Sequence, residues 1–279
     1  MKRSDLHTLK EQLTERDCEL LIDMEKYRLL TTKQIQRLHF DPVHPTPTAS
    51  ARACSRTLSR LRELQVLRAL ERRIGGVRSG SAGFIWYVGP AGERVLKSLD
   101  PPIRSGRHNH REPSRHFVDH TLAISELSVQ TIEADRQGSL EMLVLQTEPI
   151  SWQQSLSKFG TAQTLKPDLH LISVLGDYQE HRFIEADMAS EHLPVIMRQC
   201  AAYEAFRATG RYQATWGLFP VVLWVCPTSA RAAAIRAAVA ATAALDPNLF
   251  RTCTTAEYLA VVTGRATGGH DQAFQGRSP

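Results

Sequence analysis

The sequence lacks the features that mark secreted and membrane proteins. Its five cysteines are scattered, odd in number and never spaced as a metal ribbon or a redox pair, which implies no disulfide framework and indicates a reducing compartment. The amino end, MKRSDLHTLKEQL, lacks the apolar core of a secretory signal, and the apolar run at residues 216–225 is too short to cross a bilayer. We therefore expect a cytoplasmic protein with no membrane association.

Common enzyme motifs are also missing. No Gly-x-Ser-x-Gly, GxGxxG or GxxxxGK[ST] occurs, so neither a serine nucleophile elbow nor nucleotide hydrolysis is supported. What the chain does have is basic charge, because 34 Lys and Arg stand against 29 Asp and Glu for a net charge of +5. The excess lies before position 120, which favours a polyanion such as nucleic acid as the partner.

The pattern along the chain predicts two domains. Residues 1–96 show helical periodicity with short breaks, whereas residues 97–115 are rich in Pro, Arg and His without an apolar period and are expected to be a linker. Residues 116–264 read as helix, three strands, helix, strand, helix and a last strand or short helix, which predicts an α/β domain with a central mixed sheet. The whole chain is therefore expected to be of the α+β class. Residues 265–279 are rich in Gly and polar residues and are expected to be disordered.

The first domain has the element order of a winged helix-turn-helix. Helices are expected at residues 16–30, 32–40 and 48–67, followed by a ribbon through LERRIGGVRSGSAGFIWYV. In the third helix Cys54, Leu58, Leu61 and Leu64 follow one face, and arginines follow the opposite face. Such a helix suits the major groove of double-stranded DNA, where Arg bonds a guanine edge or a phosphate.

The predicted DNA contacts fall into three groups: Arg52, Arg56 and Ser59 on the exposed face, Arg60 and Arg62 on its flanks as phosphate contacts, and Arg72, Arg73 and Arg78 in the glycine-rich ribbon. The alternative is that these arginines form only a solvated helix face. Helix order, basic face and basic hairpin agree with one another, which favours DNA binding.

The second domain carries acids on two neighbouring strands. Asp168 follows Pro167 at a strand start, Glu185 lies seventeen residues later on the next strand, and Asp187 shares the face of Glu185. Converging carboxylates form an oxygen site suited to Mg²⁺, with Glu126 of the preceding helix as a further candidate ligand. The alternative is that these acids pair with Arg198, Arg182 or backbone groups in a noncatalytic sheet.

This order of helix, Pro-Asp, Glu-x-x and helix resembles the PD-(D/E)XK, or restriction-endonuclease-like, superfamily over residues 116–262. The resemblance implies that Asp168 and Glu185 match the metal-binding acids. Asp187, however, stands where that superfamily has its catalytic lysine, and an acid there opposes the developing negative charge. Cleavage would then need another cation, for which Lys166 is the candidate.

Five segments together are similar to the replication-relaxation family of plasmids, phages and other mobile elements: LTTKQIQRLHF, ARACSRTLSRLRELQVL, RHFVDHTLAISEL, KPDLHL and FIEADMASEHLPVIMRQCAAYEAF. The resemblance covers most of residues 16–262. It implies a winged helix fused to a nuclease-like domain, with a role in replication, DNA relaxation or regulation. The Glu-x-Asp form is a familiar variant in that comparison, which implies a noncanonical or inactive nuclease site.

Three functions follow from these observations. The first is a DNA-binding protein in which a noncleaving nuclease-like domain serves as a structural, DNA-clamping or dimerising platform. In the dimerising case the chain would form a homodimer. The second is a Mg²⁺-dependent DNA endonuclease that uses Asp168, Glu185 and Lys166 and is targeted by the winged helix. The third is a transcriptional repressor whose second domain senses a ligand or partner through an apolar pocket.

Overall fold

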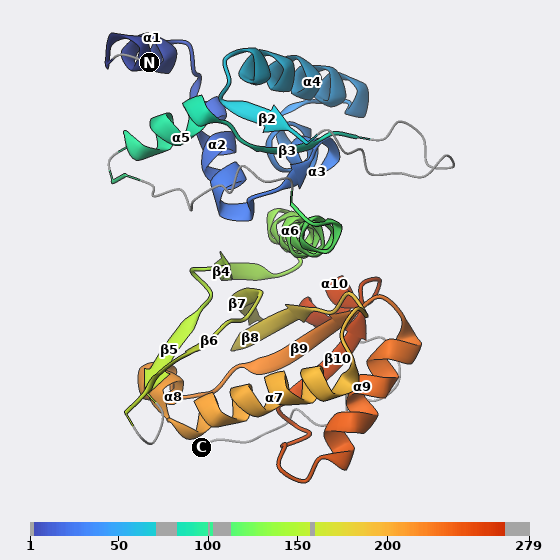
Figure 1. Ribbon diagram of the computed structural model, residues 1–279. Helices are drawn as coiled ribbons and strands as arrows, with labels where there is room; N and C mark the ends of the chain where they lie inside the picture. The colour runs from blue at the N-terminus through green and yellow to red at the C-terminus, as the bar shows by residue number, and fades with distance from the viewer. Residues whose placement is uncertain (1–2, 71–82, 100, 103–112, 157–159, 266–279) are drawn as a thin grey trace. The chain divides into compact units, whose positions relative to one another are not determined.

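The chain is an α+β protein with a mixed five-stranded sheet (Figure 1), as the sequence predicts. A computed structural model describes residues 3–70, 83–99, 101–102, 113–156 and 160–265. Contacts divide the chain into two compact units, Met1–Val129 and Gln130–Pro279, and the division falls within helix α6 (Arg115–Arg136). The predicted boundaries at 96 and 115 stay predictions, and most of the expected linker and tail lies outside the described residues.

The first unit combines helices with a small antiparallel sheet of order β1-β3-β2. Its elements, before the shared helix α6, are α1 (Arg3–Glu11), α2 (Glu15–Tyr27), β1 (Leu30–Thr31), α3 (Thr32–His39), the 3-10 turn η1 (Asp41–Val43), α4 (Pro47–Glu63), β2 (Leu67–Ala69), β3 (Ile85–Val88) and α5 (Pro90–Lys97). Three helices were expected near α2, α3 and α4. Helices α1 and α5 and the short strand β1 were not predicted.

Local capping explains where two of these helices begin. The side chain of Thr14 accepts from the backbone of Asp17 at the start of α2, and Thr31 does the same for Gln34 at the start of α3. In both cases the third helical residue bonds back to the cap, which completes a capping box. The apolar residues of α2, α3 and α4, including Leu20, Ile35 and Leu58, then meet in a buried core.

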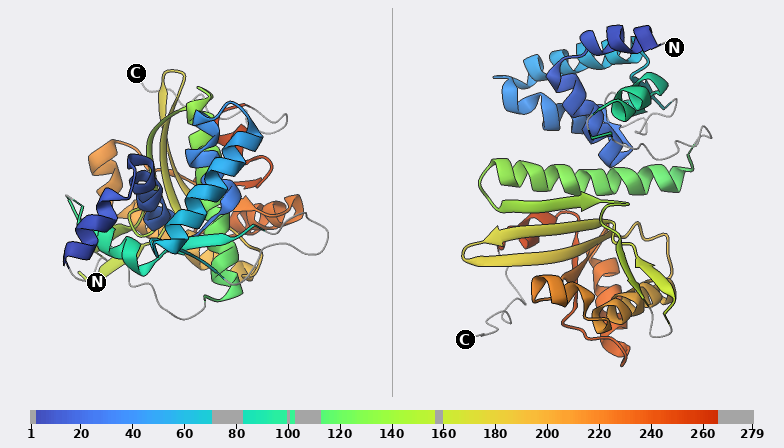
Figure 2. Two further views of the ribbon diagram at one scale, coloured as in Figure 1. Left: turned by 90° about the horizontal axis from the view of Figure 1, so that it is seen from above. Right: turned by 90° about the vertical axis from the view of Figure 1, so that its left-hand side faces the viewer.

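The second unit follows the predicted order of helices and strands, with a hairpin and a short helix added, and it ends in both a strand and a short helix where one of the two was expected. Its elements after α6 are β4 (Glu141–Thr147), β5 (Gln153–Leu156), β6 (Ala162–Leu165), β7 (Leu169–Leu175), β8 (Tyr178–Ala186), α7 (Leu193–Ala208), α8 (Arg211–Trp216), β9 (Val221–Cys226), α9 (Ser229–Ala241), β10 (Phe250–Thr254) and α10 (Tyr258–Val262). Strands β5 and β6 form a separate hairpin (Figure 2), and neither this hairpin nor α8 was predicted.

The five-stranded sheet has the order β10-β9-β8-β7-β4. Strand β7 runs antiparallel to both β4 and β8, whereas β9 runs parallel to β8 and β10 parallel to β9. One face is covered by α7 and α9, because Phe183 and Val222 of the sheet share a core cluster with Tyr203 of α7 and Ile235 of α9. On β8, successive side chains therefore alternate between this core and the opposite face.

Candidate functional site

Helix α4 is fixed to the first unit along one side. Thr46 caps its first turn through a bond from the amide of Ala49 (3.2 Å), and Pro47 suits the first helical position, where no amide hydrogen is needed. Buried residues recur at helical spacing along the helix, at Ser50, Cys54, Leu58 and Leu61. The helix consequently has one face in the core and one face in solvent.

The solvent face of α4 carries arginines separated by short side chains. Arg52, Arg56 and Ser59 are exposed, as is Arg62 on the flank. In the described part of the chain, no carboxylate pairs with any of these three arginines. Their charges are therefore available to a negatively charged partner.

Arg60 has a different environment, although it also lies on the flank of α4. Its guanidinium donates to both carboxylate oxygens of Asp17 (2.7 and 2.6 Å) and to the carbonyl of Gln12 (3.1 Å). The Asp17 side chain is only 1% exposed, so Arg60 neutralises a buried carboxylate and ties α4 to the start of α2. We therefore leave Arg60 out of the proposed interface.

The ribbon of the predicted winged helix is described only at its base. Strand β2 pairs antiparallel with β3, with Leu67 opposite Val88 and Ala69 opposite Trp86. The indole of Trp86 donates to the hydroxyl of Thr32 (2.9 Å), which attaches this strand pair to α3. The predicted contacts of the ribbon, Arg72, Arg73 and Arg78, lie outside the described residues.

The acids Asp168 and Glu185 do come together in the second unit. Because Leu169 pairs with Ile184, the antiparallel register puts Asp168 opposite Glu185. Tyr203 of α7 donates a hydrogen bond to Glu185, and the amide of Ala186 donates to Asp168 (2.8 Å). Burial, and then the neighbouring charge of Asp168, raise the pKa of the Glu185 carboxyl well above its usual range.

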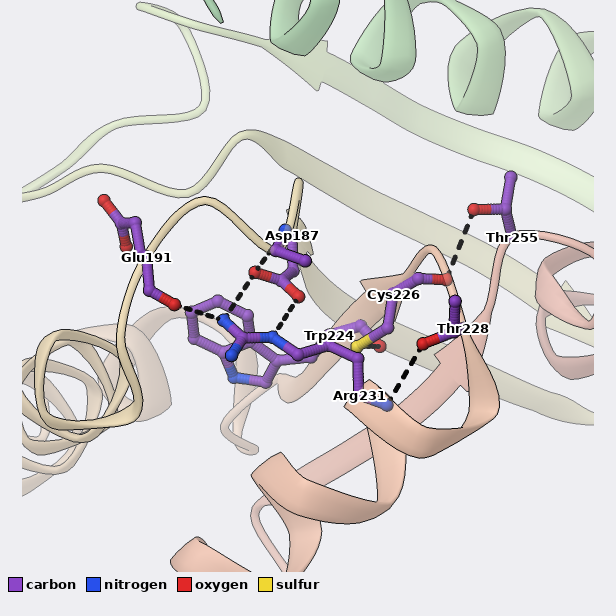
Figure 3. A network of polar contacts seen from close by, with 8 residues as sticks. Asp187, Glu191, Trp224, Cys226, Thr228, Arg231 and Thr255 are labelled. Atoms are coloured by element: carbon purple, nitrogen blue, oxygen red, sulfur yellow. Dashed lines mark hydrogen bonds and ion pairs between the residues drawn. The ribbon is translucent and has the colours of Figure 1, made fainter.

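Asp187, in contrast, is held by an arginine that the sequence did not indicate (Figure 3). Arg231 of α9 donates to both of its carboxylate oxygens (2.7 and 3.0 Å) and also to the carbonyl of Glu191 (2.7 Å). The backbone amide of Arg231 is bonded to the cap residue Thr228 (3.2 Å). The hydrogen bond to Asp187 is the main cause of the raised pKa of Arg231. Asp187 is thus part of an ion pair that joins the residue after β8 to α9.

Three other predicted cations lie elsewhere. The ammonium of Lys166 is 4.5 Å from the ring centre of Trp152, a cation–π contact. Arg182 bonds Glu180 and the hydroxyl of Ser173, and Arg198 is exposed on α7. None of these contacts joins Arg182, Arg198 or Lys166 to the acids Asp168, Glu185 and Asp187.

Glu126 belongs to the first unit. Its carboxylate accepts from Arg37 (2.6 Å) and Gln34 (3.1 Å), both on α3. Among the residues that the structure describes, no group of three or more His, Cys, Asp or Glu side chains is arranged to hold a metal ion. The two acids that the nuclease resemblance assigns to Mg²⁺, Asp168 and Glu185, each already accept a hydrogen bond from a protein donor. These residues do not form a complete oxygen site.

The comparisons with known proteins gave one match. A family model described as Replication-relaxation matches residues 21–222. No curated protein and no solved structure matches the chain. Within the described residues, no helix is both long and apolar enough to cross a membrane.

Proposed function

The chain belongs to the replication-relaxation family, and we propose that it is a DNA-binding protein of a plasmid, phage or other mobile element, acting in replication or transcription control. Family membership suggests the role in replication of mobile elements. The partner that we propose, double-stranded DNA, is argued from the first unit. The observation that carries it is the exposed face of α4, where Arg52 and Arg56 stand without carboxylate partners in the described part of the chain.

The dimensions of α4 suit the major groove. Its 17 residues make a helix about 25 Å long, and the groove admits a helix of ordinary diameter. Ala51, Ser55 and Ser59 are short exposed residues between and beside the arginines, so the helix backbone can approach the base edges closely. Arg52 and Arg56 would then reach guanine edges or phosphates, and Arg62 a phosphate.

The succession of elements supports a winged helix. Helices α3 and α4 are joined by the turn η1, and β2 and β3 follow as an antiparallel pair with residues 71–82 between them. Asp41 of the turn accepts from Ser50 of α4 and from Gln36 of α3 (3.0 Å), which fixes the angle between the two helices. In winged helices the second helix of this pair enters the groove, a role that we assign to α4.

For the second unit we propose a nuclease-like fold that does not cut DNA. Its helix, three antiparallel strands, helix and parallel strand are the arrangement expected from the PD-(D/E)XK resemblance. The position of the catalytic lysine is occupied by Asp187, and Arg231 neutralises that carboxylate instead of facing a substrate phosphate. A Mg²⁺-dependent endonuclease using Asp168 and Lys166 is the alternative that a cleavage assay tests.

The test of DNA binding measures affinity for duplex DNA by fluorescence anisotropy over a series of salt concentrations. The variant Arg52→Ala/Arg56→Ala should bind more weakly and lower the slope of log K against log salt by up to about 2, close to one unit for each phosphate that is no longer neutralised. The matched control is Arg94→Ala/Arg211→Ala, which removes the same charge from exposed positions of α5 and α8. Equal affinities and slopes for the two variants would reject α4 as the reading helix.

A further inference from the structure

We infer that Glu126 of α6 is a positioning residue for DNA binding, because it holds α3 and, through α3, the reading helix α4. This inference rests on the proposed function of α4. It assigns the part of α6 within the first unit, residues 115–129, to the DNA-binding module, although the composition of the chain predicts that this module ends near residue 96.

Two side chains of α3 bond the carboxylate of Glu126. One carboxylate oxygen accepts from the guanidinium of Arg37 (2.6 Å), and the other accepts from the side-chain amide of Gln34 (3.1 Å). Gln34 also donates to the carbonyl of Leu122, one turn earlier in α6 (3.3 Å). The Arg37 and Glu126 side chains are 17% and 32% exposed, so water screens this ion pair only in part.

Apolar contacts place the same stretch of α6 against the first unit. Val118 and Leu122 are buried in one core cluster with Leu29 and Ile85. Leu29 directly precedes β1, and Ile85 is the first residue of β3. The hydroxyl of Ser125 donates to the carbonyl of Leu29 (3.0 Å). Glu126 therefore sits at the end of an interface that is already packed, where a charge-assisted bond fixes orientation.

From α3 the chain of contacts continues to α4. Gln34, which Glu126 holds at its amide nitrogen, uses its amide oxygen to accept from the backbone of Thr31 (2.9 Å), completing the cap of α3. The carbonyl of Thr32 in the first turn of α3 accepts from the thiol of Cys54 in α4 (3.8 Å). A rotation of α3 that follows the removal of Glu126 would thus change the position of α4 relative to the rest of the unit.

A positioning role and a purely electrostatic role of Glu126 predict opposite changes in DNA affinity. Glu126→Ala removes a negative charge from the DNA-binding unit, which by itself would strengthen binding to a polyanion. If Glu126 positions α3, the variant instead binds duplex DNA about tenfold more weakly, the size expected when a charge-assisted hydrogen bond is broken. The salt slope should stay close to the wild-type value, because the variant removes none of the cations proposed to contact DNA and the affinity is lost in realigning α4.

Affinity is measured on the full chain by fluorescence anisotropy, at a temperature well below the melting transition of each variant. Asp119→Ala is the matched control, since Asp119 lies on the same helix in an exposed ion pair with Arg115. Its removal takes away the same negative charge without touching α3, so affinity should stay at the wild-type value or rise slightly. The exchanged pair Arg37→Glu/Glu126→Arg restores the attraction with opposite signs and should recover much of the affinity that Glu126→Ala loses.

Each outcome decides one question. Wild-type affinity in Glu126→Ala, or tighter binding, would overturn the inference while leaving the proposed function in place. If Glu126→Ala fails to fold, the affinities of Glu126→Gln and of the exchanged pair are compared with that of the wild type. Weaker binding by Glu126→Gln with recovery in the exchanged pair supports the positioning role. Equal affinities for the wild type and both variants reject it. Failure of the wild-type chain to bind duplex DNA would instead refute the proposed function.

Discussion

Two buried histidines of the second unit predict a loss of stability in mild acid. The hydroxyl of Tyr212 on α8 bonds both Nε2 of His170 (2.8 Å) and Nδ1 of His181 (2.7 Å), and Gln146 bonds Nδ1 of His170 (3.2 Å). With the Gln146 oxygen accepting from Nδ1 of His170, Tyr212 donates to Nε2 of His170 and accepts from Nδ1 of His181, so the His170 imidazole is neutral. Within the described residues, Nε2 of His181 has no partner.

The magnitude follows from the pKa values. Burial, and then the nearby His181, lower the pKa of His170 from 6.5 to about 4, and burial also lowers the pKa of His181. Below pH 6.5 the unfolded chain therefore binds protons that the folded chain does not take up until about pH 4, and stability falls across that window. Between pH 7.5 and 5, His170 alone should reduce the free energy of unfolding by about 2 kcal/mol.

Urea denaturation at several pH values, followed by tryptophan fluorescence, measures this change, because Trp152, Trp216 and Trp224 all lie in the second unit. His170→Gln should flatten the pH dependence, whereas the control His192→Gln, which removes an exposed histidine of the same unit, should keep the wild-type slope. Equal slopes for wild type and His170→Gln would refute the reasoning.

Three substitutions test individual contacts by urea denaturation. Arg231→Ala leaves Asp187, whose side chain is 2% exposed, without its charge partner and should cost the second unit about 3 kcal/mol. Arg60→Ala should cost the first unit a similar amount, about 3 kcal/mol, by stranding the buried carboxylate of Asp17, and should leave the salt slope of DNA binding unchanged. Gly92→Ala places a Cβ well inside van der Waals contact with a backbone carbonyl oxygen and should cost about 2 kcal/mol. A decrease below about 0.5 kcal/mol, the range of ordinary surface changes, would contradict the interaction concerned.

Periodic burial made much of the fold predictable. The spacing of Cys54, Leu58 and Leu61 in the sequence predicts the buried face of α4, and the structure buries these residues. In the second unit, alternating apolar residues indicate β7 and β8, and their antiparallel pairing brings Asp168 opposite Glu185. The spacing of apolar residues thus predicts which face of a helix or strand is buried, and the remaining residues are expected on its exposed face.

Partners far apart in the chain could not be predicted in this way. Arg231 is 44 residues from Asp187, and Arg60 is 43 residues from Asp17, so no spacing rule connects them. Glu126 lies on a helix that the sequence pattern assigns to the second domain, and from the sequence we grouped it with the acids of that domain. Its actual donors come from α3, and only the packed structure identifies them.

Some elements carried too little pattern to be recognised. The strands of the β5–β6 hairpin, QQSL and AQTL, are mostly polar and do not alternate clearly between apolar and polar residues. Helix α5 is short and contains Gly92, which disfavours a helix. The structure explains that glycine, because its backbone lies so close to the carbonyl of Val66 that no side chain fits between them.

The central claim is that this protein binds duplex DNA and does not cut it. The most direct measurement incubates the purified full chain with supercoiled and linear duplex DNA, with and without Mg²⁺ or Mn²⁺, and records retardation and strand breaks on the same samples. We expect retardation that weakens as salt rises, with no breaks in any sample. Absence of retardation at low salt, or metal-dependent nicking that Asp168→Ala abolishes, would contradict the claim.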